Sequence, residues 1–111
     1  MYLYTNVTTN MQARQEIRIP FSTTACGIIM ARSSSTWNLN LGMYTGDTIQ
    51  ILTPSPQGDS RVIFNQTSIP SAADNKLYIY RDGDRGDLVI YFNGDAQESM
   101  FFYIIGKKGT A

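Results

Sequence analysis

The sequence contains no histidine and a single cysteine, and these two shortages exclude several kinds of chemistry. Without histidine there can be no Ser-His or Cys-His nucleophilic pair and no imidazole ligand for a metal. Cys26 has no second cysteine in the chain with which to form a disulfide or a zinc site. Its neighbours Gly27, Ile28 and Ile29 are small or apolar, which favours a buried strand residue over a reactive thiol.

Charge is balanced and apolar runs are short. Nine basic and nine acidic residues give a formal net charge of zero, and Lys107 and Lys108 form the only concentration of basic residues. Nucleic-acid binding generally requires a basic face that displaces counterions, so we expect no nucleic-acid partner. No run approaches the roughly 18 apolar residues of a membrane helix, and residues 1–10 lack the features of a signal peptide. We therefore expect neither membrane insertion nor a signal peptide.

Paired carboxylates are the remaining route to enzymatic activity. The possible pairs are Asp82 with Asp84, Asp87 with Asp95, or Glu98 with any of these aspartates. Glycoside hydrolysis, however, requires two carboxyls held at a fixed separation in a cleft, one of them with a raised pKa. These aspartates lie in turn sequences, where aspartate is favoured for local reasons. We predict that the protein is not an enzyme and assign no catalytic residue.

Short alternations of apolar and polar residues, typical of β-strands, are abundant, and the longest such stretch is Lys76 to Ile105. Residues 77–80 and 88–92 alternate, whereas residues 100–105 are continuously apolar. Alternation indicates a strand with one buried face, and a continuous apolar run suits a strand covered on both faces. The intervening segments, RDGDRGD and NGDAQES, are rich in turn-forming residues. This stretch therefore predicts a three-stranded antiparallel meander.

The rest of the chain predicts further strands at residues 2–7, 15–20, 25–31, 37–41, 48–52 and 61–64. Residues 1–12 are interpreted as an edge strand or an N-terminal arm, and residues 25–31 as the centre of a sheet. Residues 53–60, with two prolines and a glycine, are interpreted as a surface loop.

The strand spacing, with no helical apolar stripe, predicts one all-β domain over residues 1–111. The expected architecture is an antiparallel β-sandwich or jelly-roll-like fold with eight or nine short strands. The predicted core residues are Leu77, Ile79, Leu88, Ile90, Phe92, Ile49 and Ile51.

Aromatic residues are frequent in these strands. Amphipathic aromatics can stack on sugar rings beside an Asp or Asn that binds hydroxyls, they can fill a subunit interface, or they can pack across strands. The candidate ligand-binding residues are Trp37, Tyr44, Tyr78, Tyr80, Asp82, Asp84 and Asn93.

The turn from Asp82 to Asp87 also raises the question of a metal. Asp82, Asp84 and Asp87 bring three carboxylates into one short loop, which a hard cation such as Ca²⁺ favours. A full calcium loop also needs a bidentate acid and carbonyl ligands, which the sequence does not identify, and Arg85 would compete for the same oxygens. These three aspartates are therefore candidate metal ligands for Ca²⁺.

Residues 75–92, NKLYIYRDGDRGDLVIYF, precede an apolar strand that closes in MFFYIIGKKG. This arrangement resembles the small β-sandwich domains that end bacteriophage tail fibres and related virion proteins. Residues 26–44 are similar to an early hairpin of those domains. The chain departs from full fibres in having no repetitive shaft and no separate virion-attachment domain.

The resemblance implies a homotrimeric module on a virion that binds a host cell-surface glycan or receptor. A homo-oligomer is also expected from Phe101, Phe102 and Tyr103, since alternation sends Phe102 to the opposite face and a small sandwich rarely covers both. The alternative is a structural virion protein, such as a capsid decoration or tail component, with no ligand of its own.

Overall fold

The computed structural model describes residues 2–19, 26–33, 38, 40–45, 48–53, 58–82 and 87–108. Within these ranges the chain forms nine strands and no helix, which confirms the all-β prediction. The strands are β1 (Tyr2–Met11), β2 (Glu16–Ile19), β3 (Cys26–Ser33), β4 (Asn40–Thr45), β5 (Thr48–Ile51), β6 (Val62–Phe64), β7 (Leu77–Arg81), β8 (Leu88–Phe92) and β9 (Glu98–Lys108). Accordingly, no helix in the described part of the chain is long and apolar enough to cross a membrane.

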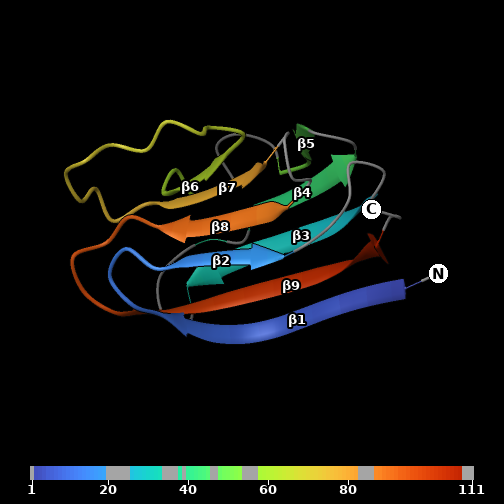
Figure 1. Ribbon diagram of the computed structural model, residues 1–111, viewed down its shortest axis with the longest axis horizontal. Coiled ribbons are helices and arrows are strands. Elements are labelled where there is room, and N and C mark those ends of the chain that lie inside the picture. Colours follow the sequence, from blue (N-terminus) through green and yellow to red (C-terminus); the bar gives the residue numbers. More distant parts are fainter. Residues whose placement is uncertain are drawn as a thin grey trace.

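The strands are arranged in two sheets (Figure 1). The five-stranded sheet has the order β1-β9-β3-β4-β5, and the four-stranded sheet has the order β2-β8-β7-β6. In the view of Figure 1, β2 passes in front of β3, and β1 and β9 run side by side at the bottom. Two positional predictions are confirmed: β3 is an interior strand between β9 and β4, and β1 is an edge strand paired with β9 alone.

The predicted meander is correct for its first hairpin and wrong for its second. Strands β7 and β8 pair antiparallel, with Leu77 opposite Phe92 and Ile79 opposite Ile90. Strand β9 does not continue from β8 but lies between β1 and β3 in the other sheet. The free edge of β8 is taken by β2, which places Ile17 opposite Ile90. In this position both edges of β9 are paired, one with β1 and the other with β3.

Two further details differ from the sequence prediction. Strands β6 and β7 pair in parallel, because the chain returns through the long connection at residues 65–76 instead of a tight turn. Strand β4 extends to Thr45, beyond residue 41 where the expected strand ends.

One cluster of buried side chains contains residues from both sheets. Met11 of β1 and Ile49 of β5 join side chains of β2, β6, β7 and β8 in this core. Six of the seven predicted core residues, all but Ile51, are buried. Ile51 is 55% exposed, because it ends the edge strand β5 opposite Gly42, which offers no side chain to cover it.

Asn65, directly after β6, connects the two sheets. Its backbone adopts a φ of 69°, in the left-handed region that Asn tolerates better than most residues. Its side chain accepts a hydrogen bond from Ile49 N at 2.8 Å and donates one to Ile49 O at 2.6 Å. Its own backbone N–H donates to Ile79 O at 2.9 Å. The edge strand of the larger sheet is thereby fixed to the smaller sheet.

Candidate functional site

The candidate site lies on the face of the four-stranded sheet that points away from the core. Side chains alternate along β7 and β8, so Ile79 and Ile90 are buried in the core while Tyr80 and Tyr91 are only half-buried. The register places Glu16 and Tyr78 opposite Tyr91, and Arg18 and Tyr80 opposite Val89. We call the accessible part of this surface the tyrosine face and define it as Glu16, Arg18, Tyr80, Asp82 and Tyr91.

Arg18 forms ion pairs with all three carboxylates at the tyrosine face. Its Nη1 lies 2.8 Å from Asp82 Oδ2 and 3.2 Å from Asp87 Oδ2, and its Nε lies 3.0 Å from Glu16 Oε2. These contacts, with the hydrogen bond to Asp82 the largest, raise the pKa of Arg18. Partly exposed ion pairs contribute only about 0 to 1 kcal/mol each to stability. Their main effect is to fix the carboxylates beside the tyrosines and to connect β2 with the ends of β7 and β8.

Tyr80 carries a hydroxyl that remains protonated at neutral pH. Burial raises its pKa, and the negative charges of Glu16 and Asp82 act in the same direction, while Arg18 opposes them. The phenol is therefore a hydrogen-bond donor as well as an aromatic surface. An accessible ring, a donor and nearby carboxylate acceptors are the groups that a polyhydroxylated ligand requires.

The structure brings two of the three candidate metal ligands together. Asp82 and Asp87 both contact Arg18 Nη1, and Asp82 N also donates to Asp87 O at 2.9 Å. Asp84, the third, lies outside the described residues. Among the side chains that the structure describes, no group of three acidic, cysteine or histidine residues could hold a metal ion. The Ca²⁺ site remains a prediction.

Tyr78 and Asn93 were expected among exposed ligand-binding residues, and the expectation of exposure is wrong for both. Tyr78 is 1% exposed and Asn93 is 0% exposed. The Tyr78 hydroxyl donates a short hydrogen bond to Asp74 Oδ2, and burial together with this carboxylate raises the pKa of Tyr78 to about 12. Asn93 Nδ2 lies 3.1 Å from Ala72 O, 3.1 Å from Asp74 Oδ1 and 3.2 Å from Pro70 O.

These contacts hold residues 70–75 against the end of the four-stranded sheet. Asn93 O also accepts hydrogen bonds from the backbone of Asp74 at 3.1 Å and of Asn75 at 2.8 Å. Arg14 Nη1 donates to Ser71 O at 2.8 Å from the neighbouring turn. Tyr78 and Asn93 therefore have a structural role, and among the aromatic side chains that the structure describes only Tyr80 and Tyr91 are partly accessible.

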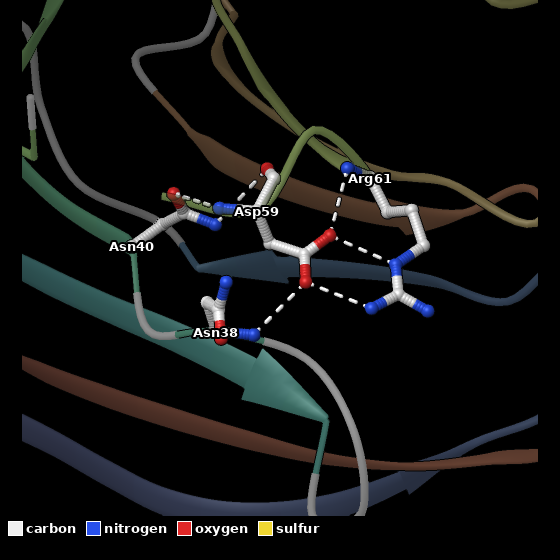
Figure 2. Close-up of polar contacts among 4 residues, drawn as sticks. All are labelled: Asn38, Asn40, Asp59 and Arg61. Atoms are coloured by element: carbon white, nitrogen blue, oxygen red, sulfur yellow. Dashed lines mark hydrogen bonds and ion pairs between the residues drawn. The ribbon is translucent and has the colours of Figure 1, made fainter. Parts of the chain in front are cut away.

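A second polar cluster ties the loop before β6 to the start of β4, and the sequence reasoning missed it (Figure 2). Asp59 Oδ1 accepts hydrogen bonds from Arg61 N at 3.0 Å and Arg61 Nε at 2.8 Å. Asp59 Oδ2 accepts from Arg61 Nη2 at 2.8 Å and Asn38 N at 2.9 Å. The hydrogen bond from Arg61 is the largest cause that lowers the pKa of Asp59 to about 2.

Asn40 completes this cluster from the first residue of β4. Its Oδ1 accepts from Asp59 N at 3.0 Å, and its Nδ2 donates to Asp59 O at 3.3 Å. Every polar group of Asp59 is thus used within the protein, which identifies the cluster as structural. The local signal for it was an aspartate two residues before an arginine at the end of a proline- and glycine-containing loop.

The remaining candidate residues cannot be assigned to the tyrosine face. Trp37 lies outside the described residues. Tyr44 belongs to β4, where its backbone lies opposite Ile49, in the other sheet from Tyr80. The ligand-binding roles of Trp37, Tyr44 and Asp84 therefore remain predictions.

Comparison with known proteins gave no relative: no family model matches the chain, and neither a curated protein nor a solved structure is similar enough to count as a match. The proposal for function therefore rests on the chain's own residues and on the resemblance of residues 75–92 and the strand that follows to tail-fibre domains.

Proposed function

We propose that the chain is a virion-associated binding module of a bacteriophage or prophage that binds a host cell-surface glycan or receptor, most directly a glycan, through the tyrosine face. One observation carries the glycan part: two half-buried tyrosines lie on one sheet surface beside Glu16 and Asp82, whose carboxylates Arg18 holds in place. Tyrosine rings stack on the apolar faces of sugars, and fixed carboxylates accept hydrogen bonds from hydroxyls. The virion location rests on the resemblance of residues 75–92 and the strand that follows.

The proposed architecture is a β-sandwich or a jelly-roll-like fold. It is supported by the core that draws on both sheets and by the hydrogen bonds between Asn65 and Ile49. Gly42 adds a third observation, because a Cβ built on it would lie 3.2 Å from the Phe64 ring. Strand β4 of one sheet therefore approaches β6 of the other closely.

The proposed assembly is a homotrimer. Gln50, opposite Met43, is exposed, so Met43 and Leu41 lie on the face of the five-stranded sheet that points away from the core. Both side chains are half-buried, and a symmetric oligomer would cover them. The side chains of Phe101, Phe102 and Tyr103, from which the sequence predicts an oligomer, lie outside the described part of the structure. The choice of a trimer follows from the resemblance to tail-fibre domains.

The alternative is a structural virion protein with no ligand of its own. The burial of Tyr78 favours it, because an aromatic residue on the outer side of a strand there has a structural role and no exposed surface for a ligand. In that case Tyr80 and Tyr91 would lie in a contact between subunits.

A glycan array probed with the purified oligomer separates the two functions. We expect binding by the unaltered protein and loss of binding in Tyr80→Ala and Tyr91→Ala, both with an unchanged oligomeric state by light scattering. Absence of binding to any glycan, together with dissociation of the Tyr80→Ala oligomer, would contradict glycan recognition and favour the structural role.

A further inference from the structure

The tyrosine face has an unequal balance of charge. Arg18 is its single cation and contacts three carboxylates, those of Glu16, Asp82 and Asp87, at distances from 2.8 to 3.2 Å. The side chains of Glu16 and Asp82 are 41% and 21% exposed, so two of these negative charges reach the surface. The side chain of Asp87 is only 7% exposed, and its main effect is to make the electrostatic potential at the tyrosine face more negative.

Neighbouring residues do not reverse this balance. Arg81 is 4% exposed and alternates to the core side of β7, and even when it is counted the carboxylates exceed the guanidinium groups by one. Residues 83–86 contain one aspartate and one arginine, so they add no net charge to this region. The effect of the carboxylates is also felt at the Tyr80 hydroxyl, whose pKa is raised by Glu16 and Asp82 in addition to burial.

We infer that the tyrosine face binds neutral or cationic glycans and discriminates against glycans that carry sialic acid, uronic acid or sulfate. This inference rests on the proposed function and specifies the chemical class of its ligand. An anionic ligand would meet excess negative charge at the sugar-stacking surface, and Arg18, the one cation among the described residues of the tyrosine face, is already compensated by three carboxylates. A neutral sugar has no such penalty, and an amino sugar gains an attraction.

Coulomb's law sets the size of the discrimination. One uncompensated charge about 6 Å away, in a water-like environment, changes affinity about threefold, and a less polar environment increases the factor. Since exposed charges are screened by salt, the preference should be largest at low ionic strength and should shrink when salt is raised.

The experiment compares matched pairs of glycans at low salt. The array hit is measured as a neutral oligosaccharide and as its sialylated and sulfated derivatives, by isothermal titration calorimetry, with the unaltered protein and with Glu16→Gln and Asp82→Asn. We expect the neutral form to bind at least threefold more tightly than the acidic forms. Each variant should reduce this ratio by about threefold, because both ligand forms lose the same hydroxyl contact while only the acidic forms are relieved of one repulsion.

Asp95→Asn is the control, because Asp95 is an exposed aspartate outside the tyrosine face and its removal should leave the ratio unchanged. Equal or tighter binding of the acidic forms would overturn the inference while leaving glycan recognition intact. The inference would also be overturned if Asp95→Asn lowered the ratio of neutral to acidic affinity as much as Asp82→Asn does. Failure to bind any neutral or acidic glycan would remove the proposed function itself, and the inference with it.

Discussion

The side-chain amide of Asn65 forms two hydrogen bonds with the backbone of Ile49, at 2.8 Å to its nitrogen and 2.6 Å to its oxygen. The amide thereby takes the place of a neighbouring strand for the edge strand β5. It also joins the five-stranded sheet to β6, which belongs to the other sheet.

Replacing Asn65 by Ala should therefore destabilise the protein by about 1 to 3 kcal/mol, because two backbone groups lose their partners and Ala tolerates the positive φ less well. Urea unfolding would measure the loss. Gln66→Ala is a matched control, since Gln66 is exposed and its amide contacts only the nearby Ser68 O. Equal stability of the two variants would contradict the role given to Asn65.

Asp59 predicts a specific acid dependence. Its pKa is about 2 in the folded protein and 3.8 in the unfolded chain, so folding lowers it. The stabilisation is complete above the unfolded value and is lost as the pH falls from about 4 towards 2. It amounts to about 2 kcal/mol. We expect Asp59→Asn to cost about this much at pH 7 and much less near pH 2, measured by urea unfolding. A cost that does not change with pH would show that the charge of Asp59 is not what stabilises the loop.

The contribution of Tyr78 to stability should be lost at alkaline pH, whereas that of Asp59 is lost at acid pH. Its folded pKa of about 12 exceeds the ordinary value of 10, so its contribution is complete below pH 10 and is lost as the pH rises towards 12. Tyr78→Phe removes the donor to Asp74 and should cost about 1 to 3 kcal/mol at neutral pH. Thermal unfolding measures the cost, and ultraviolet titration of the remaining tyrosines in the variant shows which transition belonged to Tyr78. If the variant retains the transition near pH 12, the assignment is wrong.

The sequence predicted those parts of the fold that depend on local alternation. The hairpin of β7 and β8, the interior position of β3 and six of the seven core residues follow from patterns of a few neighbouring residues. The position of β9 could not be predicted, because a continuous apolar run fits an interior strand of either sheet. The pairing of β8 with β2, which leaves no edge of β8 for β9, is a long-range contact that the local pattern does not indicate. Ile51 shows the same limit, because its exposure depends on the glycine opposite it in another strand.

The candidate site was predicted only in part, for a similar reason. Tyr80 and Asp82 are on the tyrosine face, as alternation suggested, but Glu16, Arg18 and Tyr91 were not among the predicted ligand-binding residues. Arg18 reaches Asp82 across 64 residues of sequence, a contact that only the pairing of β2 with β8 creates. Tyr78 lies on the same side of β7 as Tyr80 but is buried, with its hydroxyl bonded to Asp74, and no local pattern in the strand reveals this difference.

The most direct test of the account is to locate the bound glycan by the changes it causes in backbone amide resonances. The protein, labelled with ¹⁵N, would be titrated with the neutral oligosaccharide identified on the array. We predict that the largest shifts fall on residues 16–18, 80–82 and 89–91, and that they are absent in Tyr80→Ala. Shifts confined to the five-stranded sheet, with those three segments unaffected, would contradict the claim that the tyrosine face is the binding surface.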